Sequence, residues 1–172
     1  AGLLEQILAP GQYATNVATR PGSNERVEFA IRLPGRNQRD GIVWLPLDAK
    51  FPLEDYERLA KAQEAADAEG MEAAGKALEA RIRLEARAIA DKYLEPPATT
   101  DFALLYLPFE GLYAEVLRRP GLFDALQREC RVIVCGPTTL NAILNSLQMG
   151  FRTLAIEQRS SEVWKILGEV KG

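Results

Sequence analysis

The sequence predicts an α/β protein in which a mixed central β-sheet is flanked by helices. Two apolar segments, at 27–33 and 42–50, are separated by a polar loop at 34–41, which is typical of an antiparallel hairpin. Two later apolar runs, at 102–107 and 131–135, are each followed by a helical pattern. Strands that are joined by helices imply parallel crossovers, so the sheet should contain both kinds of pairing.

The elements follow in order from the local patterns. Residues 1–8 have a helical pattern that Pro10 and Gly11 end. After the hairpin, a proline and two acids open a long segment rich in Ala, Glu, Lys and Arg. We expect an inserted helical hairpin at about 53–94, with its turn near Gly70. Further helices are predicted at 112–117, 122–130 and 138–151, and in a last segment through Val163, Trp164 and Leu167.

Composition limits the chemistry. A chain of 172 residues can bury one sizeable core, and we expect residues 1–172 to form a single domain. The net charge of −3 weighs against a protein that coats nucleic acid by charge alone. The absence of histidine excludes Ser-His-Asp and Cys-His triads. The two cysteines, Cys130 and Cys135, are too few for a disulfide framework and are expected to be small core residues.

The hairpin can be given a register. A loop centred near residue 38 gives antiparallel partners whose numbers sum to about 76. On one face this register pairs only apolar residues, namely Phe29 with Leu47, Ile31 with Leu45, and Leu33 with Val43. On the opposite face it pairs Glu28 with Asp48, and two such carboxylates repel unless a cation lies between them or one is protonated.

Lys50 lies two residues after Asp48 and therefore on the same face of the strand. An acid and a lysine at this spacing are commonly just a solvated face, but here the strand before them is apolar on both sides. Together with Glu28, the pair has the layout of a metal-dependent nuclease of the PD-(D/E)xK type. Asp48 and Glu28 would hold Mg²⁺ or Mn²⁺, and Lys50 would stabilise negative charge.

Several motifs in the same order resemble the RmuC family of bacterial DNA recombination proteins. They are Leu4–Leu8, Gln12-Tyr13, Leu45–Leu53 followed by Tyr56, Thr100–Gly111 and Gly136–Leu140. The resemblance covers nearly the whole chain. It implies a PD-(D/E)xK nuclease-like domain, preceded in the family by a membrane anchor and a coiled coil. We expect neither in this chain, which begins abruptly in a helical pattern, as a piece of a longer protein would.

The resemblance also implies site residues. Asp48 and Lys50 match the acid-x-Lys motif of the family, and Val27-Glu28 stands where the family shows Pro-Asp. Glu5 falls where such nucleases add a further metal-facing acid. We therefore expect Glu28, Asp48 and Lys50 to be catalytic, and Glu5, Glu28 and Asp48 to hold Mg²⁺ or Mn²⁺.

The function implied is a metal-dependent DNA nuclease in recombination or repair. The alternative is an inactive nuclease-fold module that binds DNA or a protein partner. DNA is the expected partner, and self-association would use the coiled coil outside this chain. A cytoplasmic location without membrane contact is expected for this segment, with the full-length protein anchored to the inner membrane.

Weaker signals leave alternatives open. Gly70–Lys76 has the spacing of a phosphate-binding loop, but Ala77 stands where Ser or Thr is needed, so we interpret it as a chance match. Glu110, Thr138 and Thr139 have the character of helix caps, although helix N-termini also bind phosphates. Basic residues that could contact a phosphate backbone, or could simply be exposed, are Arg36, Arg39, Arg81, Arg83 and Arg87.

Overall fold

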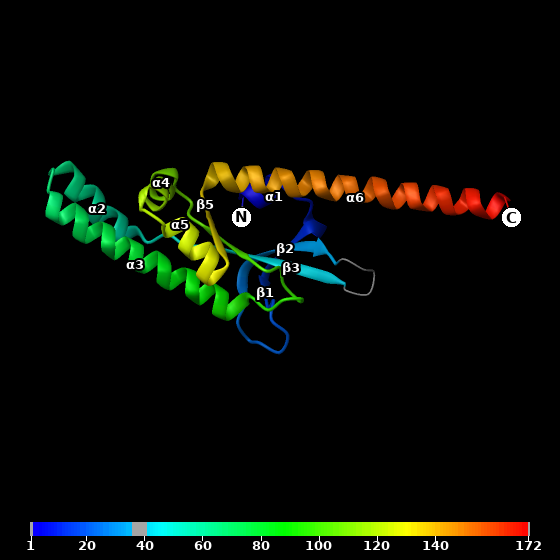
Figure 1. Ribbon diagram of the computed structural model, residues 1–172, viewed down its shortest axis with the longest axis horizontal. Helices are drawn as coiled ribbons and strands as arrows, with labels where there is room; N and C mark the ends of the chain where they lie inside the picture. Colours follow the sequence, from blue (N-terminus) through cyan, green and yellow to red (C-terminus); the bar gives the residue numbers. More distant parts are fainter. Residues whose placement is uncertain (1, 36–40, 172) are drawn as a thin grey trace.

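A computed structural model describes residues 2–35 and 41–171 and shows a five-stranded mixed sheet (Figure 1). Its strands lie in chain order: β1 (Tyr13–Val17), β2 (Val27–Pro34), β3 (Ile42–Ala49), β4 (Ala103–Tyr106) and β5 (Val132–Cys135). The pairs β1–β2 and β2–β3 are antiparallel, whereas β3–β4 and β4–β5 are parallel. The predicted mixed sheet is confirmed.

Helices cover both faces of this sheet. One face carries α2 (Leu53–Glu64), α3 (Ala68–Tyr93), α4 (Glu110–Arg118), α5 (Leu122–Ala125) and the π-helical turn η2 (Leu126–Cys130). The other face carries α1 (Gly2–Ile7) and the first part of α6 (Pro137–Lys171), with the short 3₁₀ turn η1 (Pro10–Gln12) after α1. No helix within the described ranges is long and apolar enough to cross a bilayer.

The predicted hairpin register is confirmed over the pairs that the structure shows. Phe29 lies opposite Leu47 and Ile31 opposite Leu45. All four side chains are buried in one cluster beneath α1 and α6. A slip of one residue would have turned this apolar row to the other face, which explains why the pattern alone could specify the register. The loop residues 36–40, with Arg36 and Arg39, lie outside the described residues.

The edge strand β1 was not predicted. Its two polar residues, Thr15 and Asn16, are adjacent, so it lacks the alternation that marked β2. It pairs with β2 at Thr15–Phe29 and again at Val17–Val27, but no pair forms between Asn16 and Glu28. Asn16 has a left-handed backbone with φ of 54°, a conformation that asparagine tolerates better than most residues. The ladder is therefore interrupted beside Glu28.

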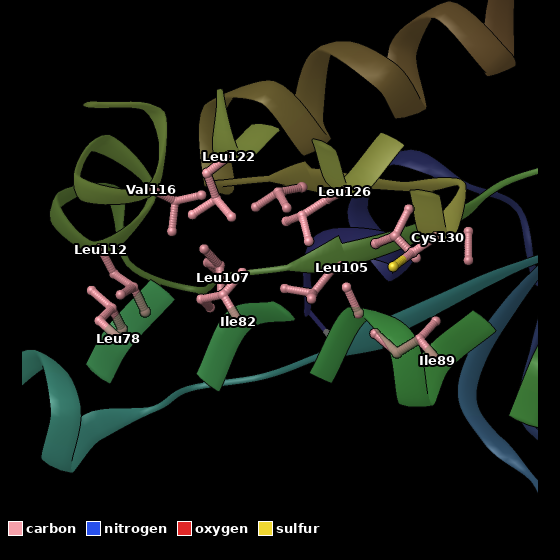
Figure 2. Close-up of a cluster of buried hydrophobic side chains, with 14 of the residues drawn as sticks. Leu78, Ile82, Ile89, Leu105, Leu107, Leu112, Val116, Leu122, Leu126 and Cys130 are labelled. Carbon is pink, nitrogen blue, oxygen red and sulfur yellow. The ribbon is translucent and has the colours of Figure 1, made fainter. Parts of the chain in front are cut away.

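Helix α3 is the main support of the second core (Figure 2). Its apolar stripe follows helical spacing through Leu78, Ile82 and Ile89, all buried. This stripe packs in one cluster with Leu105 of β4 and Leu126 of η2. The stripe holds the long helix against β4, next to the strand that carries Asp48.

The turn of the helical hairpin lies before Gly70, not at it. Helix α2 ends at Glu64, and Ala66 takes a left-handed backbone with φ of 51°. Asp67 then caps α3, because its side chain accepts a hydrogen bond of 3.1 Å from the Gly70 backbone N–H. A Cβ at Gly70 would collide with the Asp67 side chain, so this glycine serves the cap. The phosphate-loop spacing at 70–76 thus falls inside a helix, as the chance-match interpretation expected.

The two C-terminal helices that we predicted are one helix. Helix α6 runs from Pro137 to Lys171 without a break at Gly150. A single glycine costs a helix about 1 kcal/mol and does not end it. The patterns differ on the two sides of Gly150 because only the first part packs on the sheet, with Leu140 and Leu144 buried.

An ion-pair cluster joins α3 to the segment after α4, and it gives a stability prediction. The Glu79 carboxylate lies 2.8 Å from Arg119 Nε and 3.1 Å from Arg83 Nη2. The hydrogen bond from Arg119 is the largest cause that lowers the pKa of Glu79 below its usual value of 4.5. Because the folded-state pKa is depressed, the stabilisation is complete above pH 4.5 and is lost as the pH falls below it.

We expect Glu79→Gln to lower the free energy of unfolding at neutral pH by about 1–2 kcal/mol, since a charge-assisted hydrogen bond is weakened. Urea unfolding of both proteins should show this difference shrinking as the pH falls below 4.5. The exposed pair Glu72–Lys76 supplies the control, because Glu72→Gln should have little effect. A difference that stays constant down to acid pH would contradict this account.

Candidate functional site

Asp48 and Lys50 lie where β3 ends. Asp48 pairs in register with Leu105 of β4, on the face that α3 covers, and it is only 7% exposed. Lys50 follows the strand, and its backbone N–H donates a 2.9 Å hydrogen bond to the carbonyl of Tyr106. The backbone on both sides of the pair is therefore held by β4. In sheets with parallel strands, the carboxyl edge is where ligands usually bind.

The Lys50 ammonium lies between two carboxylates. Its Nζ is 3.2 Å from Asp48 Oδ2 and 3.4 Å from Glu85 Oε2 on α3. Partial burial acts to lower the pKa of Lys50, but the charges and hydrogen bonds of Asp48 and Glu85 outweigh it, and the net pKa is raised. Lys50 therefore stays protonated at neutral pH. It can stabilise an anion, whereas it is unsuited to act as a general base.

The ion pairs continue away from the sheet. Glu85 also pairs with Arg81, one turn earlier on α3, at 3.8 Å, and Arg81 pairs with Asp55 of α2 at 3.5 Å. Acidic and basic side chains thus alternate in a row of ion pairs that begins at Asp48 and ends at Asp55 on the helical hairpin. This network ties the position of both helices to the end of β3.

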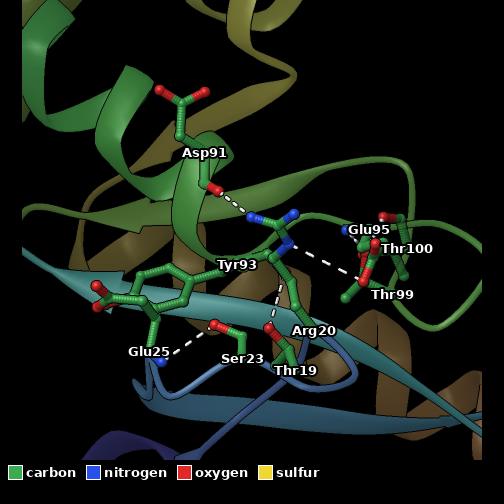
Figure 3. A network of polar contacts seen from close by, with 9 residues as sticks. All are labelled: Thr19, Arg20, Ser23, Glu25, Asp91, Tyr93, Glu95, Thr99 and Thr100. Atoms are coloured by element: carbon green, nitrogen blue, oxygen red, sulfur yellow. Dashed lines mark hydrogen bonds and ion pairs between the residues drawn. The ribbon is translucent and has the colours of Figure 1, made fainter.

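Tyr93, at the end of α3, is a further neighbour of the pair. Burial is the largest cause that raises its pKa, and the negative charge of Asp48 raises it further. The phenol therefore stays protonated. Its backbone carbonyl accepts a 2.7 Å hydrogen bond from the buried Thr19 hydroxyl, and Arg20 donates to the carbonyl of Asp91 (Figure 3). These bonds hold the connection between β1 and β2 against the end of α3.

Glu28 and Glu5 are placed differently from Asp48. Glu28 is exposed on β2, one step beyond the last pair of the hairpin ladder, Phe29 with Leu47. Glu5 is exposed on α1, which packs on the other face of the sheet. Among the described residues, no ion pair or hydrogen bond links either of them to Asp48 or Lys50. Their roles as metal ligands stay predictions.

Glu85 is the site residue that sequence reasoning missed. Glu85 lies on α3, 35 positions later in the chain than Lys50, so no local motif points to it. One signal was available: Glu85 directly precedes the buried Ala86, within a helix that turns its apolar stripe to the sheet. A carboxylate at the margin of such a stripe reaches toward the sheet rather than into open solvent.

The end of β3 offers oxygen donors that a divalent ion could use. Over the part of the chain that the structure describes, no group of three or more Asp, Glu, Cys or His side chains is close enough to hold one metal. Asp48 and Glu85 are two carboxylates that share one ammonium. Mg²⁺ is commonly held by one or two carboxylates, with waters completing its shell. Two hard oxygen donors fit a hydrated ion of this kind.

The remaining predicted residues have structural roles. Glu110 accepts a 2.6 Å hydrogen bond from the Thr138 backbone N–H, and this bonding lowers the pKa of Glu110. The cap thus serves α6, and not the helix that Glu110 itself begins. Thr139 accepts a 2.8 Å hydrogen bond from the Gly136 backbone N–H. Cys130 and Cys135 are buried, and burial raises the pKa of Cys135 to about 12.

The arginines of α3 do not form one basic surface. Arg81 and Arg83 are engaged in ion pairs, while Arg87 is exposed. A cavity of about 370 Å³ near the end of α3 is lined in part by Arg87, Asp91 and Arg131. The cavity is lined by neither Asp48 nor Lys50, so it is separate from the end of β3.

Comparison with known proteins agrees with the motifs. Residues 1–172 match the RmuC family. The chain is 62% identical over 169 residues to a "DNA recombination protein RmuC homolog" from Xylella fastidiosa, in strains Temecula1 and 9a5c. That alignment covers 98% of this chain and 37% of the relative. A protein of the same name from Pseudomonas aeruginosa is 28% identical over 166 residues, covering 92% of this chain and 34% of the relative.

This chain therefore spans little more than a third of the length of these relatives. No solved structure matches it. The family match extends over every element described above, including the strand that carries Asp48 and the helix that carries Glu85. The chain belongs to the RmuC family.

Proposed function

We propose that this chain is a metal-dependent DNA nuclease domain of the PD-(D/E)xK type, acting in DNA recombination or repair. One observation carries the proposal: a buried aspartate and a protonated lysine, two residues apart, end a central strand of a mixed sheet. Family membership and the names of the relatives, which call them DNA recombination proteins, support the choice of substrate.

Asp48 is the first ligand in this proposal because its backbone is paired with β4 and its carboxylate is held by Lys50. Glu28, from the hairpin register, and Glu5, from the family motif, are proposed as further ligands, and both would have to move toward Asp48, because no three acidic side chains of the described residues lie close enough together to hold one ion. Glu85 joins them as a carboxylate that already faces the Lys50 ammonium. A bound Mg²⁺ or Mn²⁺ would polarise the phosphate and lower the pKa of a water.

Lys50 supplies a fixed positive charge. Its pKa is raised, so the ammonium stays charged at neutral pH. A compact ammonium suits a phosphate oxygen that gains charge in the transition state. To meet a phosphate, the ammonium must loosen one of its two carboxylate contacts, and a divalent ion at Asp48 would favour that exchange.

A second candidate function is a nuclease-fold module that binds DNA or a protein partner without cutting. The run of ion pairs from Asp48 through Lys50 and Glu85 to Arg81 favours it, because such a network can brace the helical hairpin without taking part in any chemistry. In that case Lys50 is a structural counter-ion.

A cleavage assay separates the two. We expect the chain to nick or linearise supercoiled DNA with Mg²⁺ or Mn²⁺ and to lose this activity with excess chelator. Linear and branched DNA would identify the preferred substrate structure. Binding to any of these DNAs without cleavage, at every metal concentration tried, would favour the non-cutting module.

A further inference from the structure

Helix α6 has two parts with different surroundings. Its first part packs on the sheet through Leu140 and Leu144, in one cluster with Leu4 and Leu8 of the first helical segment. Its second part extends away from the sheet and forms one end of the molecule (Figure 1). From Arg152 to Glu169, every side chain that the structure describes is exposed.

The second part nevertheless carries large apolar side chains. Ile156 is 64% exposed and Trp164 is 73% exposed, and Val163 and Leu167 are exposed beside them. A contiguous apolar face of this kind on a helix is normally covered. A shallow groove of about 340 Å³ runs along the same face, lined by Ile156, Arg159, Ser160, Val163, Trp164 and Leu167.

The spacing of this face is that of a coiled coil. Small or apolar residues alternate at steps of four and three along one seam: Met149, Thr153, Ile156, Ser160, Val163 and Leu167. Alternating steps of three and four are the a/d pattern that keeps one side of a helix against a partner helix. The groove residues are members of this seam or its direct neighbours. The face is thus shaped for another helix of similar pattern.

We propose that the seam binds the same seam of a second copy of this chain, in parallel and in register. The charges beside the seam support this partner and this orientation. Arg152 and Glu157 lie on opposite flanks and five residues apart, so a parallel pair sets Arg152 of one copy beside Glu157 of the other. An antiparallel pair would instead bring the flank with Arg152 and Arg159 against the same flank of its partner.

The association should be weak and concentration-dependent. The seam is about 27 Å long at 1.5 Å per residue, and Thr153 and Ser160 contribute little apolar area to it. Sedimentation of the 172-residue chain over a range of concentrations should show a rise from the monomer mass to that of an oligomer. A monomer at all concentrations would overturn the proposal and leave the face to another segment or partner.

A matched pair of variants tests whether the seam is responsible. Ile156 and Leu154 are both exposed apolar residues of α6, but only Ile156 lies on the seam. Ile156→Glu should give a monomer, whereas Leu154→Glu should associate like the unchanged chain. Because both side chains are exposed, neither change should alter the helical circular dichroism of the monomer. Equal effects of the two substitutions on association would overturn the proposal that the copies associate through this seam.

Cysteine cross-linking tests the orientation. Thr153→Cys and Ser160→Cys should each form disulfide-linked dimers on mild oxidation with copper–phenanthroline, because parallel copies bring equal positions together. Ser161→Cys is the control, one residue off the seam, and should cross-link far less. The native cysteines are buried and should not contribute. Cross-linking at Ser160→Cys but not at Thr153→Cys would indicate an antiparallel pair and overturn the proposed arrangement.

Discussion

Replacing Lys50 with alanine should reduce metal-dependent DNA cleavage by about 10²–10³-fold, the loss expected when one preorganised charge is removed from a transition state. The reason is the fixed ammonium between Asp48 and Glu85, whose raised pKa keeps it charged. Initial rates on supercoiled DNA with saturating Mn²⁺ measure the effect. Lys76→Ala is the control, because that lysine is exposed on the same helical hairpin and its one ion pair among the described residues is with Glu72.

The same variant should bind Mn²⁺ at least as well as the unchanged chain. Lys50 competes with a cation for Asp48, so its removal leaves Asp48 without this ammonium and Glu85 with only Arg81 as a cationic partner among the described residues. Opposite effects on cleavage and on metal binding distinguish a lysine that acts in the reaction from one that merely neutralises carboxylates. If Lys50→Ala cleaves DNA at the normal rate, Lys50 has no part in the chemistry.

Replacing Ile82 with alanine should lower the free energy of unfolding by about 2–4 kcal/mol, the usual cost of a cavity in a packed core. Ile82 is fully buried between α3 and the sheet, in the same cluster as Leu105 and Leu107. Leu84→Ala is the matched control, because Leu84 lies on the same helix and is 61% exposed. Its substitution should change stability by less than about 0.5 kcal/mol. Urea unfolding measures both, and equal losses would contradict the packing of α3.

The hairpin could be predicted in detail because its information is local. Apolar residues at every second position of β2 and β3 leave one register in which Phe29 and Ile31 meet Leu47 and Leu45. The parallel strands β4 and β5 were also predictable, since each is a short apolar run followed by a helical pattern. In these elements, the spacing of apolar residues along the sequence directly indicates which side chains are buried.

Elements that depend on distant contacts could not be predicted. The strand β1 has neither the apolar alternation of β2 nor the continuous apolar run of β4, and it is a strand only because β2 offers it an edge. Likewise, Glu85 becomes part of the site only through the packing of α3. The buried stripe of that helix includes Ala86, and its contact with the sheet brings the adjacent Glu85 to Lys50. The sequence placed Asp48 beside Lys50, and tertiary packing added the second carboxylate.

Titration calorimetry of Mn²⁺ into the unchanged chain and into Asp48→Asn tests the central claim most directly, because a neutral amide replaces the proposed first ligand without changing its shape. Glu110→Gln is the control, since that carboxylate caps α6 and should not affect metal binding. We predict that the unchanged chain and Glu110→Gln bind the ion alike, and that Asp48→Asn binds it more than about tenfold more weakly. Equal binding by all three proteins, or no binding by any of them, would contradict a metal site at Asp48 and favour the module that does not cut.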